Sequence, residues 1–139
     1  MTYPISPQPS MHSGGAGLYS TAEELSLILA EVLSDGGGRL FKSGDTARLL
    51  FESRLTGPAE SALQAALQSW LTSNPATMKA WETSEPKFGL GYLVNAKDIV
   101  ETGRKAGTGS WWGLSGTAAW VDPESGIAVN IVLSRFPIH

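Results

Sequence analysis

The chain has 139 residues, of which 42% are hydrophobic and 17% charged, enough for one globular domain with its own core. A net charge of −3 gives no electrostatic basis for binding nucleic acid or an anionic membrane. The lack of cysteine excludes disulfides and thiolate metal sites, and the two histidines are far apart and have no carboxylates at metal-site spacing. We therefore expect neither a metal nor another cofactor.

The N-terminal residues have neither the basic segment nor the apolar run of a signal peptide. No apolar stretch approaches the roughly 20 residues that span a bilayer. We therefore expect a cytoplasmic protein that makes no membrane contact.

Residues 1–17 predict an extended, proline-rich lead that ends in a glycine-rich turn. A helix is expected next, with Ser20 as its N-cap and Glu23 completing a capping box. Its apolar residues recur at helical spacing: Leu25, Ile28, Leu29 and Val32. Three glycines at 36–38 end this helix.

Two further helices are expected before residue 75. One begins after Ser43, with Asp45 in its first turn. The other opens at Pro58, which a first turn tolerates, and closes at Asn74. Its apolar stripe consists of Leu63, Ala66, Leu67 and Trp70.

The pattern changes to that of strands after Pro86. Alternation predicts strands over 88–95, 105–114, 117–121 and 127–133, with a tight turn at 122–126. Helices followed by strands in meander order indicate an α+β fold with an antiparallel sheet. We expect one domain over 1–139, with a helical part at 18–75 and antiparallel strands at 86–137.

Three passages resemble one known family, and they occur in the family's order. Residues 14–25 read GGAGLYSTAEEL, residues 88–92 read FGLGY, and the segment from Gly109 through Ile127 contains GSWWGL and VDPESGI. These resemble the glycine-rich helix entry, the F-G-L-G strand and the third active-site motif of class C β-lactamases and family VIII esterases. The doubled tryptophan most resembles fungal transesterases of the lovastatin acyltransferase kind. The resemblance implies a truncated β-lactamase or transpeptidase-like fold and a place in secondary metabolism.

The third motif in that family is Lys-Thr-Gly, His-x-Gly or Trp-x-Gly, and the matching positions here are Trp111, Trp112 and Gly113. The resemblance implies that Trp111 walls an acyl pocket, that Gly113 lets substrate approach the backbone, and that the Leu114 N–H serves in the oxyanion hole. Adjacent residues of a strand point to opposite faces, so one tryptophan can instead belong to the core. Tyr19, in the helix entry, is a further expected substrate contact.

The family's nucleophile is the serine of a Ser-x-x-Lys motif, which lies upstream of the glycine-rich entry in family members. The one literal match here is Ser84-Glu85-Pro86-Lys87. Pro86 disfavours the helix that would bring Ser84 and Lys87 onto one face, so we reject this match. Tyr19 and Tyr92 do not match the family's catalytic tyrosine.

Three functions remain open. The first is a nucleophile-free enzyme that acts on a small acyl or polyketide-like molecule by non-covalent proton transfer, with catalytic candidates His12, Tyr92 and Lys105 and further candidates Tyr19 and Glu101. The second is a subunit or fragment of a split serine hydrolase or acyltransferase that needs a partner chain. The third is a non-catalytic small-molecule binding module.

The sheet also predicts a protein partner. Strands without flanking neighbours must cover their edges, and helix faces that would contact an N-terminal region must be covered as well. We expect a homodimer or a complementing partner chain.

Overall fold

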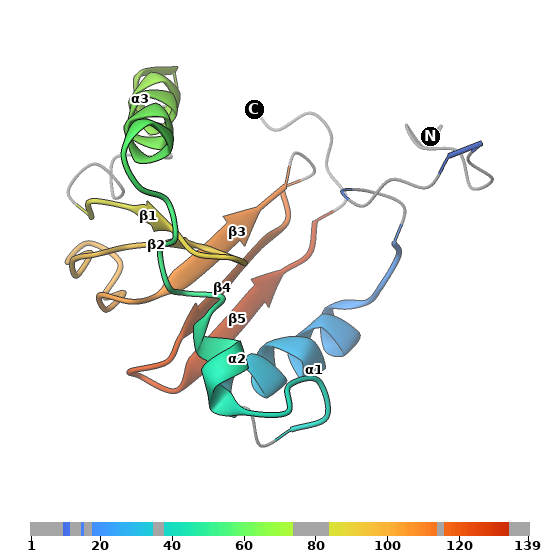
Figure 1. Cartoon of the computed structure of the whole chain (residues 1–139). Helices are drawn as coiled ribbons and strands as arrows, with labels where there is room; N and C mark the ends of the chain where they lie inside the picture. Colours follow the sequence, from blue (N-terminus) through green and yellow to red (C-terminus); the bar gives the residue numbers. More distant parts are fainter. Residues whose placement is uncertain are drawn as a thin grey trace.

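The computed structural model describes residues 10–11, 15, 18–34, 38–73, 84–113 and 116–133 (Figure 1). The helices come first: α1 (Ala22–Leu33), α2 (Gly44–Arg48) and α3 (Pro58–Ser73). Five strands follow: β1 (Lys87–Phe88), β2 (Leu93–Val94), β3 (Gly109–Trp112), β4 (Ala118–Asp122) and β5 (Ile127–Ile131). All neighbouring strands are antiparallel, and the sheet order is β1-β2-β3-β4-β5. The predicted α+β fold with a meander sheet is confirmed.

Helix α1 starts one residue later than predicted. Its N-cap is Thr21, whose hydroxyl accepts from the Glu24 N–H at 3.2 Å, while the Glu24 carboxylate accepts from the Thr21 N–H at 3.1 Å. Ser20 donates to the same carboxylate at 2.9 Å instead of capping the helix. The backbone hydrogen bond from Thr21, followed by that of Ser20, lowers the pKa of Glu24.

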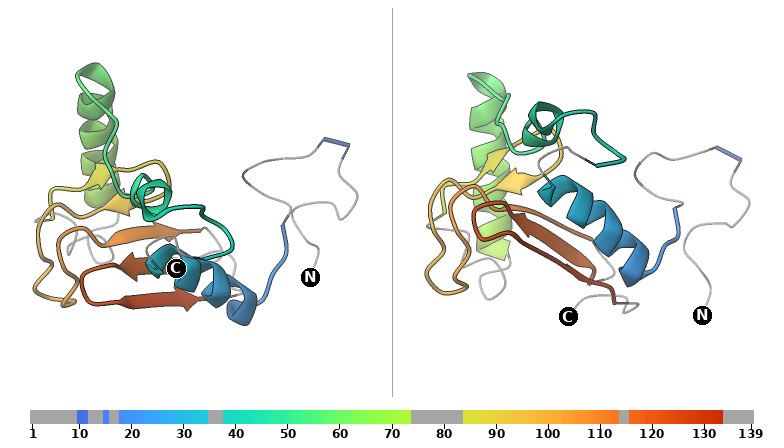
Figure 2. Two further views of the ribbon diagram at one scale, coloured as in Figure 1. Left: turned by 60° about the horizontal axis from the view of Figure 1, so that its bottom comes forward. Right: turned by 90° about the horizontal axis from the view of Figure 1, so that it is seen from below.

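The two longer helices contact opposite faces of the sheet. Leu29 and Val32 of α1 pack against Val121 of β4, and these three residues form the core of that face. On the other face, Leu93 of β2 packs against Leu63 and Leu67 of α3. Fully burying one such side chain stabilises the fold by about 1.5–3 kcal/mol. Figure 2 shows α3 beside β1 and β2, and α1 alongside β5.

The predicted strand over 88–95 is instead a short hairpin, so this prediction was wrong. The chain turns between β1 and β2, where the Gly89 N–H donates to the Tyr92 carbonyl at 2.8 Å. The Gly91 N–H donates to the Leu50 carbonyl at 3.1 Å. A Cβ on Gly89 would lie 2.1 Å from the Leu50 carbonyl oxygen. The glycines are thus needed for close backbone packing against the segment after α2, and their alternation with larger residues imitates a strand pattern.

Candidate functional site: an apolar cavity at the end of β3

A cavity of about 570 Å³ lies between the start of α1 and the end of the sheet where β3 passes into β4. Distant segments line it: the start of α1, Leu50 just after α2, the β1–β2 hairpin, and the ends of β3, β4 and β5. Most of its lining is aliphatic or aromatic. The lining also includes the polar or aromatic residues and the glycine at the end of β3: Ser20, Tyr92, Trp111, Trp112, Gly113 and Thr117.

One wall of this cavity is aromatic. Trp111 of β3 is 53% exposed and meets Phe88 edge to face at 5.5 Å between ring centroids. The neighbouring Trp112 is half-buried and packs against Trp70 of α3 at 5.3 Å. A half-exposed tryptophan held by another ring presents a large apolar surface with little side-chain freedom left to lose, which favours contact with a ligand.

Gly113 follows this wall and holds the end of β3 against β4. Its N–H donates to the Thr117 carbonyl at 2.9 Å, and a Cβ on Gly113 would lie 2.7 Å from the Thr117 hydroxyl oxygen. Backbone groups alternate between the two edges of a strand, so the N–H of Trp112 is directed to the opposite edge. At that edge of β3, strand β2 pairs with Gly109 and Ser110. The rest of β3, Trp111 and Trp112, extends beyond β2 and lines the cavity.

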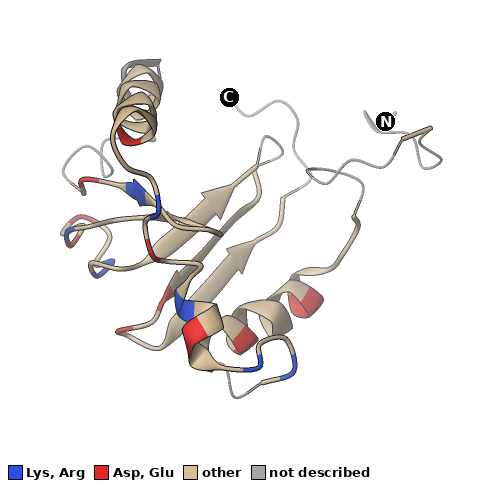
Figure 3. Cartoon of the chain, viewed as in Figure 1, with Lys and Arg blue, Asp and Glu red and all other residues tan. Residues whose placement is uncertain are grey.

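The polar groups of the cavity are hydroxyls. Ser20, Thr21, Thr117 and Tyr92 line it, and none of the described residues that do so is Lys, Arg, His, Asp or Glu. Strands β3 to β5 carry a single charged residue, Asp122, and the other charges of the described residues lie on β1, helices and loops (Figure 3). Burial raises the pKa of Tyr92, whose ring stacks on Phe51 at 5.1 Å. A phenol in this state donates a hydrogen bond and is a poor base.

The structure brings together four of the residues expected at a site: Tyr92, Trp111, Trp112 and Gly113 all line the cavity. Tyr19 is 65% exposed and next to Ser20, but it is not among the lining residues. His12 and Leu114 lie outside the described residues. Glu101 is exposed in the loop between β2 and β3.

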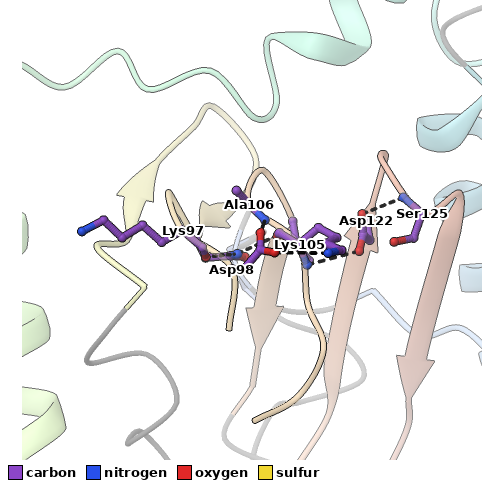
Figure 4. Close-up of polar contacts among 8 residues, drawn as sticks. Lys97, Asp98, Lys105, Ala106, Asp122 and Ser125 are labelled. Carbon is purple, nitrogen blue, oxygen red and sulfur yellow. Dashed lines mark hydrogen bonds and ion pairs between the residues drawn. The ribbon is translucent and has the colours of Figure 1, made fainter. Parts of the chain in front are cut away.

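Lys105 lies at the other end of β3, in a network that holds loops together (Figure 4). Its ammonium group donates to Asp98 at 3.2 Å, and this hydrogen bond raises the pKa of Lys105. The Ala106 N–H donates to Asp98 at 2.8 Å and is the main cause of that residue's lowered pKa. Asp122 accepts from the Ser125 N–H at 3.0 Å within the predicted turn. The network closes two turns and is not part of the cavity.

The segment that carries the literal Ser-x-x-Lys match is not helical. Ser84 is buried and its carbonyl accepts from two backbone N–H groups of the loop after β2, whereas Lys87 opens β1 and is exposed. Glu85, between them, has a positive φ of 47°. The two side chains therefore lack the one-turn helical spacing that the family's serine and lysine need.

Sequence reasoning missed the contribution of α1. Ser20 and the N-cap Thr21, just before the helix, line the cavity, as do Leu25 and Ile28 of the predicted apolar stripe. An amphipathic pattern shows that one face is covered but not whether protein or a cavity lies against it. Among the described residues, no three His, Cys, Asp or Glu side chains gather as a metal site, and no helix is long and apolar enough to cross a membrane.

Comparison with known proteins decides the ancestry of this fold. The sequence model of the family described as Beta-lactamase matches residues 2–139. The chain belongs to the beta-lactamase family. A comparison with curated protein sequences gave no significant match.

Solved structures of two other members of this fold are similar. Simvastatin synthase (LovD) from Aspergillus terreus, unliganded, superposes with a TM-score of 0.72 at 22% identity, covering 89% of this chain and 31% of that one. EstCE1, a hydrolase with promiscuous acyltransferase activity, superposes with a TM-score of 0.60 at 22% identity, covering 88% and 27%. The fold is thus beta-lactamase-like and related to those of acyltransferases and esterases. The chain spans under a third of the length of either.

Proposed function

We propose that the cavity binds an uncharged apolar group, an acyl chain or an aromatic ring, of a small organic molecule. The observation that carries this proposal is the lining itself: an aromatic wall at Trp111, aliphatic side chains from α1 and β5, and hydroxyls as the polar groups. Apolar concave sites with few polar groups are typical of small-molecule sites. The hydroxyls of Ser20 and Thr117 can orient an ester or ketone oxygen.

A carboxylate-bearing ligand such as a β-lactam fits this cavity poorly. Trp111 stands where the resemblance places the lysine of a Lys-Thr-Gly motif, and no described lining residue is cationic. The first turn of α1, whose residues adjoin the cavity lining in sequence, carries two acidic residues, Glu23 and Glu24, and no basic one. A desolvated carboxylate without a cationic partner is strongly disfavoured.

Chemistry in this cavity, on our proposal, is non-covalent. The lining hydroxyls have no lysine or histidine among the described lining residues to remove their protons. Tyr92, a phenol whose pKa burial raises further above neutral pH, supplies a hydrogen bond to a substrate oxygen. Positioning and exclusion of water are then the main contributions to any turnover.

A second candidate rests on a separate observation. The chain spans 31% of simvastatin synthase, and on this second proposal its cavity is one side of a site completed by a longer fold. The chain would then supply the acyl-binding wall of an acyltransferase or esterase, with the nucleophile contributed by another segment or chain. A serine outside the described cavity residues would carry the covalent step.

Tryptophan fluorescence tests the binding proposal directly. We expect p-nitrophenyl butyrate, a neutral ester, to quench the emission saturably, and Trp111→Ala to weaken this binding about tenfold, or about 1.4 kcal/mol. Val100→Ala, at an 88% exposed loop position outside the cavity, is the matched control and should bind as the parent does. Equal affinity of Trp111→Ala and the parent, or equally tight binding of the anionic β-lactam nitrocefin, would contradict the proposal.

A covalent serine probe separates the two candidates. No labelling of the isolated chain, together with saturable ester binding, supports the non-covalent site. Stoichiometric labelling of a serine in this chain refutes it. Hydrolysis that appears only after the N-terminal part of a relative is added as a second chain favours the acyl-binding wall.

A further inference from the structure

On the α1 face of the sheet, the residues of β3 and β4 lie in three successive rows. Opposite residues of an antiparallel pair lie on the same face, and every second residue of a strand shares that face. The first row, at the end of the sheet, joins Gly113 to Thr117 through the hydrogen bond at 2.9 Å. In the second row Trp111 lies opposite Ala119, and the third row contains Val121. The first two rows line the cavity.

The third row closes the inner end of the cavity. Val121 has 0% of its surface exposed and packs against Leu29 of α1, which is itself buried and lines the cavity. Across the ladder, a Cβ on Gly109 would lie 2.7 Å from the Phe51 ring and 2.8 Å from the Tyr92 side chain, so these two aromatic residues fill the space above the glycine. A ligand chain that enters at the first row therefore ends at the second.

The second row has a small residue between two larger ones. Ala119 of β4 lies between Trp111 of β3 and Asn130 of β5. The Asn130 amide is fixed by α1, because it donates to the Ser26 hydroxyl at 2.6 Å and to the Ala22 carbonyl at 3.2 Å. Side chains directly opposite each other in a sheet are in contact distance, so a larger residue in place of the alanine would fill the space between its neighbours. The methyl group of Ala119 is thus the floor of the cavity.

We propose, on the basis of the function proposed above, that Ala119 sets the length of the acyl chain that the cavity accepts. The Thr117 hydroxyl orients the ester oxygen at the first row, and the chain runs along β4 to the Ala119 methyl group. Two residues of a strand span about 7 Å. An extended chain advances about 1.2 Å per single bond, so a linear acyl chain of about six carbons fills this length. The substrate class is therefore esters of short linear fatty acids.

A series of p-nitrophenyl esters tests the chain length, with binding followed by quenching of tryptophan fluorescence. In the parent, each added methylene from acetate to hexanoate should tighten binding by up to about fourfold, and octanoate should bind no more tightly than hexanoate. Ala119→Leu adds an isopropyl group to the floor and should weaken hexanoate binding by about tenfold or more, while acetate binding changes less than about twofold. Ala62→Leu, at an exposed position of α3, is the matched control and should keep the parent's chain-length profile.

Ala119→Gly enlarges the cavity instead, and it is the deciding variant if urea denaturation shows that Ala119→Leu does not fold. Removal of the methyl group should lengthen the longest tightly bound chain by about one carbon, from hexanoate to heptanoate. A parent that binds no ester of any length overturns this proposal together with the function proposed above. Ester binding whose chain-length profile the folded Ala119 variants leave unchanged overturns this proposal alone.

Discussion

Gly89→Ala offers a sharp test of how the β1–β2 hairpin is held. The new Cβ would lie 2.1 Å from the Leu50 carbonyl oxygen and 2.8 Å from its carbon, which are backbone atoms that cannot rotate away. Overpacking of this kind costs about 1–3 kcal/mol. Moving the hairpin outward also weakens the bond from the Gly91 N–H to Leu50, worth about 1 kcal/mol. We expect a total loss of about 3 kcal/mol in the free energy of unfolding.

Urea denaturation followed by tryptophan fluorescence measures this loss, and thermal melting should show a decrease of about 12 °C. Gly15→Ala is the matched control, because a Cβ there meets no atom within 4 Å, and it should change stability by less than about 0.5 kcal/mol. Gly89→Ala would refute the reasoning if it were as stable as the control. That result would show that the β1–β2 hairpin does not pack closely against the segment after α2.

Three further predictions concern the core, the helix cap and the pH dependence. Leu29→Ala removes a 3% exposed side chain from the core and should lower the free energy of unfolding by about 2–5 kcal/mol, and a loss below 1 kcal/mol in chemical denaturation would contradict the assigned core. Thr21→Ala removes the hydroxyl that accepts from Glu24 and should cost about 1 kcal/mol, seen as a lower melting temperature, whereas no change would place the cap elsewhere. Burial alone would raise the pKa of Asp122, but hydrogen bonds, chiefly from Ser125, leave it lowered. Its stabilising contribution is therefore present above the unfolded pKa of about 3.9 and lost as pH falls through the lower folded pKa. Asp122→Asn should be less stable at pH 7 and lose less stability between pH 5 and 2 in denaturation experiments, and an unchanged acid slope would show that other carboxyls account for it.

The sequence by itself determined the elements whose geometry is local. Pro58 at a helix start and the turn at 122–126 depend on dihedral angles and hydrogen bonds within a few residues, so they were predicted at or near their observed positions. The start of α1 shows the limit of this reasoning. Two pairs fit the capping pattern, Ser20 with Glu23 and Thr21 with Glu24. The structure shows that Thr21 is the last residue with extended dihedral angles before the helix, so Thr21 is the N-cap.

Tertiary structure decided the hairpin and the site. The turn between β1 and β2 is held because the N–H groups of Leu90 and Gly91 donate to the carbonyls of Leu49 and Leu50, about 40 residues earlier, and no local pattern contains these partners. Alternation predicted that Trp111 and Trp112 face different sides of the sheet, but not which of them is covered. Trp112 packs against Trp70 of α3, so Trp111 is the more exposed of the two and forms the cavity wall. The cavity joins α1 to strands about 100 residues later along the chain, so its lining follows from packing between distant segments, which periodicity in one segment does not encode.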